Sequence, residues 1–247
     1  MKFLKITWLI VASFILLSCA GTEENVKQSD KSSNINVELG ITYMREGKFD
    51  TAMDRLQKAI RQNPSNPQAY SSLALLQMRL DQDEDAEQNF QKAISMDPAN
   101  SAIKNNYGTF LCQQKRYPEA QEQFLDAIKN PLYKTPEHAY VNAGKCTTDK
   151  ALSEKYYRAA LRRNPTLPAA LLEMARLSFE LKRYLSARAY LQRYHAEREP
   201  DAASLWASVQ VEKQLGDDNT MRKHASMLQR KFPDSEEMRQ YLQWVKK

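Results

Sequence analysis

Between residues 68 and 100, apolar side chains recur at helical spacing in two successive runs that are separated by an acidic turn. The first run is carried by Tyr70, Leu73 and Ala74, and the second by Ala86, Phe90 and Ala93. Pro98 follows the second run and cannot continue a helix. The pattern predicts a helix, a turn and a second helix.

The same pattern returns at an offset of 34 residues in both directions. The positions equivalent to Ala74, Ala86, Phe90, Ala93 and Pro98 are Gly40, Ala52, Leu56, Ala59 and Pro64 towards the N-terminus, and Gly108, Ala120, Phe124, Ala127 and Leu132 towards the C-terminus, where Pro131 comes one place early. A 34-residue period with small residues where the helices cross and a closing proline is the tetratricopeptide signature. Small residues at the crossings let the two helices of a unit approach closely.

Extending this period over the chain predicts an all-α fold, a right-handed superhelical solenoid of six tetratricopeptide repeats and a C-terminal capping helix. The fourth repeat is shortened, because Gly144 and Ser153 are nine residues apart where Ala74 and Ala86 are twelve apart. The repeats are expected at approximately 34–66, 67–100, 101–133, 137–167, 168–200 and 201–234. The capping helix is expected within residues 235–247, with Met238, Leu242 and Val245 facing inward.

The first residues of the chain have the pattern of a secretory signal. Lys2 and Lys5 precede a short apolar run, and Cys19 follows it directly. A cysteine at this point resembles the bacterial lipobox, which implies a signal peptide over residues 1–18 and a lipid-modified Cys19. The polar residues that follow predict a flexible tether over residues 19–33. The alternative is an ordinary signal peptide that happens to contain a cysteine.

The charge of the chain is modest and does not indicate nucleic acid binding. The formal net charge is +6, and it becomes +4 when a signal sequence carrying Lys2 and Lys5 is removed. The remaining cations are spread over several repeats and are expected to be solvated helix faces, among them Arg55, Lys58, Lys92, Lys129, Arg162 and Arg163.

Two further cysteines, Cys112 and Cys146, are one repeat length apart and late in the first helices of neighbouring repeats. Stacked helices place such positions side by side, so we expect a disulfide in an oxidising envelope compartment. The alternative is a pair of buried thiols that pack as small apolar residues.

No motif of an enzyme, a cofactor site or a metal site is present in the sequence. His138, His195 and His224 are expected to be far apart in the repeats, and no His-Glu-x-x-His or paired Cys-x-x-Cys occurs. A phosphate-binding glycine loop and a Gly-x-Ser-x-Gly turn are also missing. We therefore predict a protein that is not an enzyme, with no cofactor and no small-molecule substrate.

The expected site is a groove lined by the first helices of the repeats, which such arrays use to bind peptide segments. In repeats one and two, aliphatic, methionine and arginine residues occupy matching positions, whereas the equivalent positions of repeat three are polar. The predicted groove residues are Val37, Ile41, Met44 and Arg45 in repeat one and Leu75, Met78 and Arg79 in repeat two. The alternative is that these side chains pack between the repeats.

Taken with the lipobox, the tether and the six repeats, two segments make the resemblance more specific: NNYGTFLC at 105–112 and AYVNAGKC at 139–146. The chain resembles the type IV pilus biogenesis and stability lipoproteins, the PilF/PilW family, over almost its whole length. The resemblance implies a pilotin, lipid-anchored through Cys19 at the periplasmic face of the outer membrane. Such a protein helps secretin subunits reach the membrane and multimerise, with a secretin segment as the partner in the groove.

Two other roles fit the same repeats. One is a scaffold that stabilises the pilus fibre or its function after secretin assembly. The other is an adaptor subunit of a different envelope complex, such as one that acts on peptidoglycan.

Overall fold

The computed structural model describes residues 28–246, and the chain divides into two compact units, Met1–Gln114 and Lys115–Lys247. Every regular element in the described range is a helix, which confirms the all-α prediction. Within that range, no helix is both long enough and apolar enough to cross a membrane.

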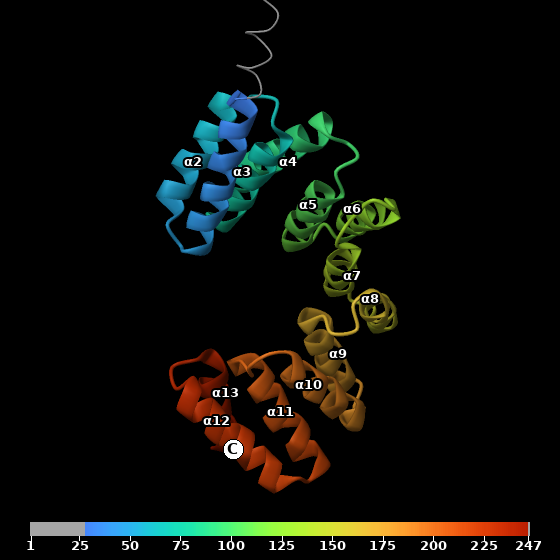
Figure 1. The fold of residues 1–247 in the computed structure, drawn as a ribbon. Helices are drawn as coiled ribbons and strands as arrows, with labels where there is room; N and C mark the ends of the chain where they lie inside the picture. Colours follow the sequence, from blue (N-terminus) through green and yellow to red (C-terminus); the bar gives the residue numbers. More distant parts are fainter. Residues whose placement is uncertain (1–27, 247) are drawn as a thin grey trace, which may run out of the picture. The chain divides into compact units, whose positions relative to one another are not determined.

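The first unit contains two helix pairs and the first helix of the third repeat (Figure 1). Each helix packs against its neighbours in the chain, and α3 also contacts α5, the next first helix. Its helices are residues 28–45, α2 (Phe49–Gln62), α3 (Pro67–Arg79), α4 (Asp83–Met96) and α5 (Ser101–Gln113).

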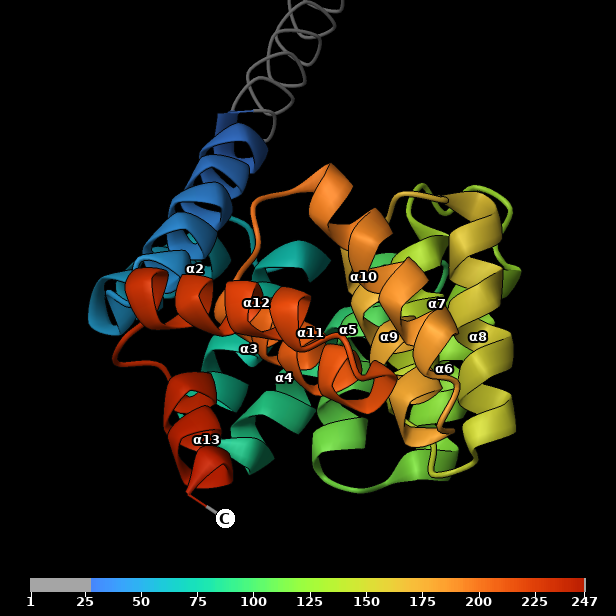
Figure 2. The same cartoon turned by 90° about the horizontal axis from the view of Figure 1, so that it is seen from below.

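The second unit continues the alternation of first and second helices, and α12 lies beside α11 and α13 in the view of Figure 2. The first helices α9 and α11 contact each other directly, so they form one layer. The helices are α6 (Tyr117–Lys129), α7 (Pro136–Lys145), α8 (Lys150–Arg163), α9 (Pro168–Glu180), α10 (Tyr184–Glu197), α11 (Ala202–Leu215), α12 (Asp218–Lys231) and α13 (Glu236–Val245).

The residues predicted at the helix crossings are buried, and small residues are required there. In repeat one, a Cβ on Gly40 would lie 2.6 Å from Cγ of Leu56. In repeat two, Ala74, Ala86 and Phe90 have no exposed surface. Close approach of the two helices in each pair therefore depends on these positions.

The turns between the paired helices share one backbone feature, a residue with positive φ. Gly47 (φ 74°), Asp81 (56°), Lys115 (61°), Lys182 (57°) and Gly216 (75°) adopt the left-handed conformation at equivalent places. The turn of repeat four, between α7 and α8, has no such residue among the positive-φ positions of the described chain. It is also the turn with the missing residues: α7 has 10 residues, whereas α3, α5 and α9 have 13.

One boundary differs from the sequence-based expectations. The predicted tether extends to residue 33, but residues 28–33 are helical and belong to the first repeat. Side-chain hydrogen bonds hold this turn: Ser33 Oγ donates to the Ala59 carbonyl at 2.9 Å, and Asn66 Nδ2 donates to Ser33 Oγ at 2.9 Å. The polar side chains on which the prediction of a flexible segment rested instead form hydrogen bonds with the next helices.

The capping helix is correctly expected, but the predicted inward face is partly wrong. Met238 is buried, whereas Leu242 and Val245 are exposed. Tyr241 and Trp244 take their place, with ring centroids 6.2 and 5.9 Å from that of Trp206. The larger aromatic rings reach α11 and therefore set the rotation of α13.

Candidate partner-binding surfaces

The groove predicted in repeats one and two is partly interior. Val37 and Met44 are only 4% and 5% exposed, and each belongs to a buried apolar cluster. Their side chains pack between α2, α3 and the helix at 28–45, so the prediction that they face a partner is wrong. The signal that suggested a groove, apolar residues at matching positions, is the same one that repeat packing requires.

The other predicted groove residues are less deeply packed. Ile41 and Leu75 are half-buried against the cluster around Met44, and Met78 is half-buried as well. Arg45 is exposed, and Arg79 Nη1 donates to the backbone carbonyl of Met44 at 3.2 Å. This surface is therefore narrower than the one predicted.

A hollow of about 380 Å³ lies between α7, α8 and α9 in the second unit; we call it the α7–α9 hollow. It is found where the turn of repeat four is short, so that α9 extends beyond the end of α7. The missing last turn of α7 accounts for the space. The lining residues are Gly144, Lys145, Thr147, Thr148, Lys150, Ser153, Tyr157, Glu173, Arg176, Leu177 and Glu180.

The α7–α9 hollow is polar at its rim and apolar beneath. Glu173 accepts from Lys145 at 3.2 Å and from Arg176 at 3.4 Å. Glu180 accepts from Lys150 at 2.9 Å, so three cations face two carboxylates. The rim therefore carries one more positive charge than negative, and it is open to solvent.

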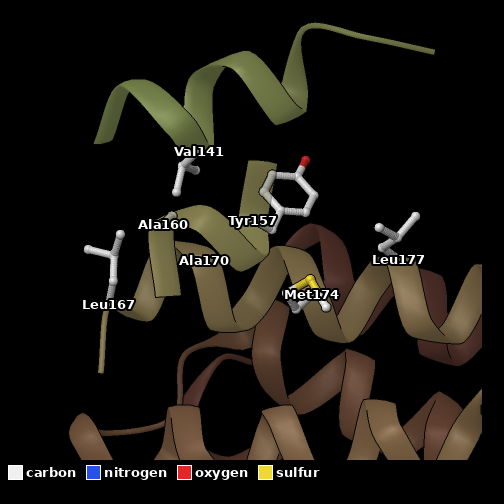
Figure 3. Close-up of a cluster of buried hydrophobic side chains, with 7 residues drawn as sticks. All are labelled: Val141, Tyr157, Ala160, Leu167, Ala170, Met174 and Leu177. Atoms are coloured by element: carbon white, nitrogen blue, oxygen red, sulfur yellow. The ribbon is translucent and has the colours of Figure 1, made fainter. Parts of the chain in front are cut away.

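Tyr157 separates this rim from the core. Its ring lies between the helix that carries Val141 and the helix that carries Met174 and Leu177 (Figure 3). Burial raises the pKa of the Tyr157 phenol well above its ordinary value, and the nearby Glu173 carboxylate adds to the shift. A phenol is neutral near pH 7 in any case, and this one can donate or accept a hydrogen bond.

A second hollow, of about 200 Å³, lies between α9 and α11; we call it the α9–α11 hollow. It is more apolar, because Phe179, Ala207 and Val211 line it. Arg176 and Glu180 line both hollows, so the two adjoin each other. Together they form a strip along the first helices, which we call the α7–α9–α11 face.

The sequence reasoning missed this face because it followed the apolar positions of the first two repeats. One signal was available, the nine-residue separation of Gly144 and Ser153. That separation shows that the turn of repeat four is short. A hollow arises there only because α9 packs beside the shortened α7.

The histidines are arranged differently from the prediction. His195 of α10 and His224 of α12 have ring centroids 5.9 Å apart, so these two are not far apart. His195 Nε2 and His224 Nδ1 are buried without a hydrogen-bond partner. In the described residues, no group of three or more His, Cys, Asp or Glu side chains could hold a metal ion.

Two of the three cysteines lie in the described part of the chain. Cys112 belongs to α5 in the first unit, and Cys146 is the buried C-cap residue of α7 in the second. Their pairing stays a prediction. Cys19 and the signal sequence lie outside the described residues.

Family models of the tetratricopeptide repeat match residues 40–81 and 73–139. The type IV pilus assembly protein PilF of Pseudomonas aeruginosa is 29% identical over 218 residues, which cover 87% of this chain and 86% of that protein.

Two solved structures resemble this fold over most of the chain. The structure of Pseudomonas aeruginosa PilF has a TM-score of 0.74 and 29% identity, covering 87% of this chain and 98% of that one. The structure of PilW, described as a widely conserved type IV pilus biogenesis factor, has a TM-score of 0.75 and 31% identity, covering 85% of this chain and 98% of that one. The chain therefore belongs to the PilF/PilW family of tetratricopeptide-repeat proteins of type IV pilus biogenesis.

Proposed function

We propose that this protein is an outer-membrane pilotin, which binds secretin subunits and promotes their localisation and multimerisation during type IV pilus biogenesis. Membership of the PilF/PilW family supports a role in this pathway. The α7–α9–α11 face is the observation that carries the binding role, because it is a polar-to-apolar strip along the first helices. Arrays of this kind use that layer to hold peptide segments.

The two hollows suit an extended segment of a secretin subunit. The α9–α11 hollow would take an apolar side chain against Phe179 and Val211. The α7–α9 hollow offers Lys145 and Arg176 to polar or acidic groups of the same segment. Neighbouring apolar and charged subsites favour one register of the bound segment over others.

The membrane part of the proposal rests on the N-terminal sequence. A lipid-modified Cys19 would hold the protein at the periplasmic face of the outer membrane, since several acyl chains give lasting anchoring. In this scheme the repeats bring the bound secretin to the membrane in which its ring assembles.

The test is an unboiled denaturing gel of outer membranes, probed for heat-sensitive secretin multimers. It compares wild-type cells, a deletion, and cells that carry Arg176→Glu, a partly exposed residue shared by both hollows. Arg222→Glu on α12 is the matched control, because it makes the same charge change on an exposed side chain outside the α7–α9–α11 face.

We expect multimers to disappear in the deletion, to fall in Arg176→Glu at unchanged protein level, and to persist in Arg222→Glu. Multimers that persist in the deletion while piliation is lost would overturn the pilotin role and favour the scaffold that acts after secretin assembly. If neither secretin multimers nor piliation change in the deletion, the adaptor role in another envelope complex replaces both.

A further inference from the structure

A group of cations gathers on one side of α8, although the sequence suggests that the basic residues are spread over the repeats. A hollow of about 450 Å³ lies between α8 and the start of α10, and we call it the α8–α10 hollow. Its six lining residues are Ala151, Glu154, Lys155, Arg158, Arg162 and Arg183. Figure 2 shows α8, in yellow, at one edge of the second unit, with α7 and α9 to one side of it.

Glu154 is the one acidic residue that lines the α8–α10 hollow, and two arginines share it. Its carboxylate lies 2.6 Å from Arg158 Nη2 and 3.0 Å from Arg183 Nη1. Lys155 and Arg162 make no ion pair in the part of the chain that the structure describes. Four cations against one carboxylate leave an excess of three positive charges.

Part of this arrangement disfavours the stability of the helices. Lys155, Arg158 and Arg162 follow one another at spacings of three and four residues, so like charges are neighbours on one face of α8. Arg183 is the N-cap of α10, whose positive end repels a cation, and the first turn of α10 has no acidic residue. Arg162 lies in the last turn of α8, where a cation is favourable, and Arg158 and Arg183 pair with Glu154, so folding accounts for part of this charge but not for Lys155 or for the excess.

The geometry suits a partner that enters the hollow with several carboxylates. The three cations of α8 span about 10 Å along the helix axis, at 1.5 Å per residue. Glu154 holds two guanidinium groups in place, and a guanidinium binds carboxylates through two parallel hydrogen bonds. The hollow is open to solvent, so the carboxylates of a peptide segment can reach its cations directly.

We infer that the α8–α10 hollow is a docking site for an acidic segment of a protein partner, a surface distinct from the α7–α9–α11 face. The two surfaces share no lining residue: α8 gives Lys150, Ser153 and Tyr157 to the α7–α9 hollow, and a different set of side chains to the α8–α10 hollow. The protein could therefore bind its cargo on one side and an acidic component of the envelope machinery on the other. The inference does not depend on the identity of that cargo.

The test measures fluorescence anisotropy of a fluorescein-labelled decaglutamate peptide with the purified full-length protein. Lys155→Glu/Arg162→Glu reverses the two cations that make no ion pair in the described chain, so the Glu154 pairs stay intact. Arg222→Glu/Arg230→Glu on α12 makes the same change in net charge on exposed side chains outside the hollow. Lys155→Gln/Arg162→Gln serves if the charge-reversed variant does not fold, as judged by circular dichroism.

We expect the α8 variant to bind the peptide about tenfold more weakly and the α12 variant to change the affinity less than about twofold. An equal loss of peptide affinity in both variants would mean that the peptide is attracted to the net charge of the protein, and it would overturn the site. Displacement of the peptide by glycerol phosphate at an equal concentration of anionic groups overturns it as well, because it shows a phosphate site that lipid headgroups would fill.

Discussion

The ring of Tyr157 occupies the space that a side chain at Gly144 would need, since a Cβ on Gly144 would lie 2.5 Å from its Cε1. Because Val141 and Met174 confine the ring, it cannot move aside freely. This contact joins α7 to α8 directly beneath the α7–α9 hollow. The shortened repeat therefore keeps the tight helix crossing of the other repeats.

Gly144→Ala should lower the free energy of unfolding by about 1–3 kcal/mol, because an added methyl group overpacks this crossing. Chemical denaturation followed by circular dichroism measures the change. In Gly144→Ala/Tyr157→Leu, the smaller residue removes the ring, so the combined loss should be less than the sum of the two single losses. Strict additivity would show that the two residues do not compete for one space.

Asn66 should stabilise the first unit through two separate roles. Its side-chain oxygen accepts from the Gln68 amide at 3.0 Å as the N-cap of α3, and its nitrogen donates to Ser33 Oγ and to Asn34 Oδ1, both at 2.9 Å. Asn66→Ala should cost about 2–3 kcal/mol by denaturation, from one cap and two hydrogen bonds. Asn66→Asp keeps the cap and loses the donors, so it should cost less. Equal losses for both would contradict a role for the cap, and no loss in Asn66→Asp would contradict a role for the donors.

Arg188 neutralises a carboxylate that is taken out of water. The side chain of Glu212 is 5% exposed, and it accepts from Arg188 Nε at 3.0 Å and from its Nη2. Arg188→Ala leaves this charge unpaired and should lower the free energy of unfolding by about 3 kcal/mol. Arg188→Met/Glu212→Leu removes both charges and should recover most of that loss. No recovery in the double variant would show that shape, not charge, decides the effect.

The His195–His224 pair should make stability depend on pH. Burial lowers the pKa of His195, with a smaller effect from His224, and burial also lowers the pKa of His224, against Glu212 and Asp217, which raise it. Below about pH 6.5 the unfolded chain takes up protons that the folded chain resists. The stability is therefore full above that pH and is lost as the pH falls through the lowered folded-state values.

Denaturation midpoints measured between pH 7 and pH 5 check this. The wild type should lose stability over the interval, and His195→Gln/His224→Gln should lose less. His138→Gln, a change at the exposed histidine, should follow the wild type. The same slope in all three proteins would place the dependence on other groups.

Cys112 and Cys146 should form a disulfide when the protein is produced in an oxidising compartment, because one repeat period separates them. Peptide mapping by mass spectrometry without reductant should recover the two segments linked. Replacing either cysteine by serine should lower the free energy of unfolding by about 2–4 kcal/mol. Alkylation of both thiols in denaturant without reductant would contradict the bridge.

The sequence alone determined the features that repeat locally. The 34-residue period, the small residues at helix crossings and the closing prolines predicted paired helices, because helix formation and crossing depend on neighbours within one repeat. Gly40 opposite Leu56 and Gly144 opposite Tyr157 are the direct result.

The tertiary structure decided which side chains are exposed and which distant residues meet. Val37 and Met44 follow the same helical pattern as a groove residue would, and only the packing of the next repeat buries them. His195 and His224 are 29 residues apart, and stacking of α10 and α12 brings their rings together. A shortened α7 becomes a hollow only because α9 extends beyond it. Exposure, hollows and such contacts depend on neighbouring repeats, which the pattern within one repeat does not contain.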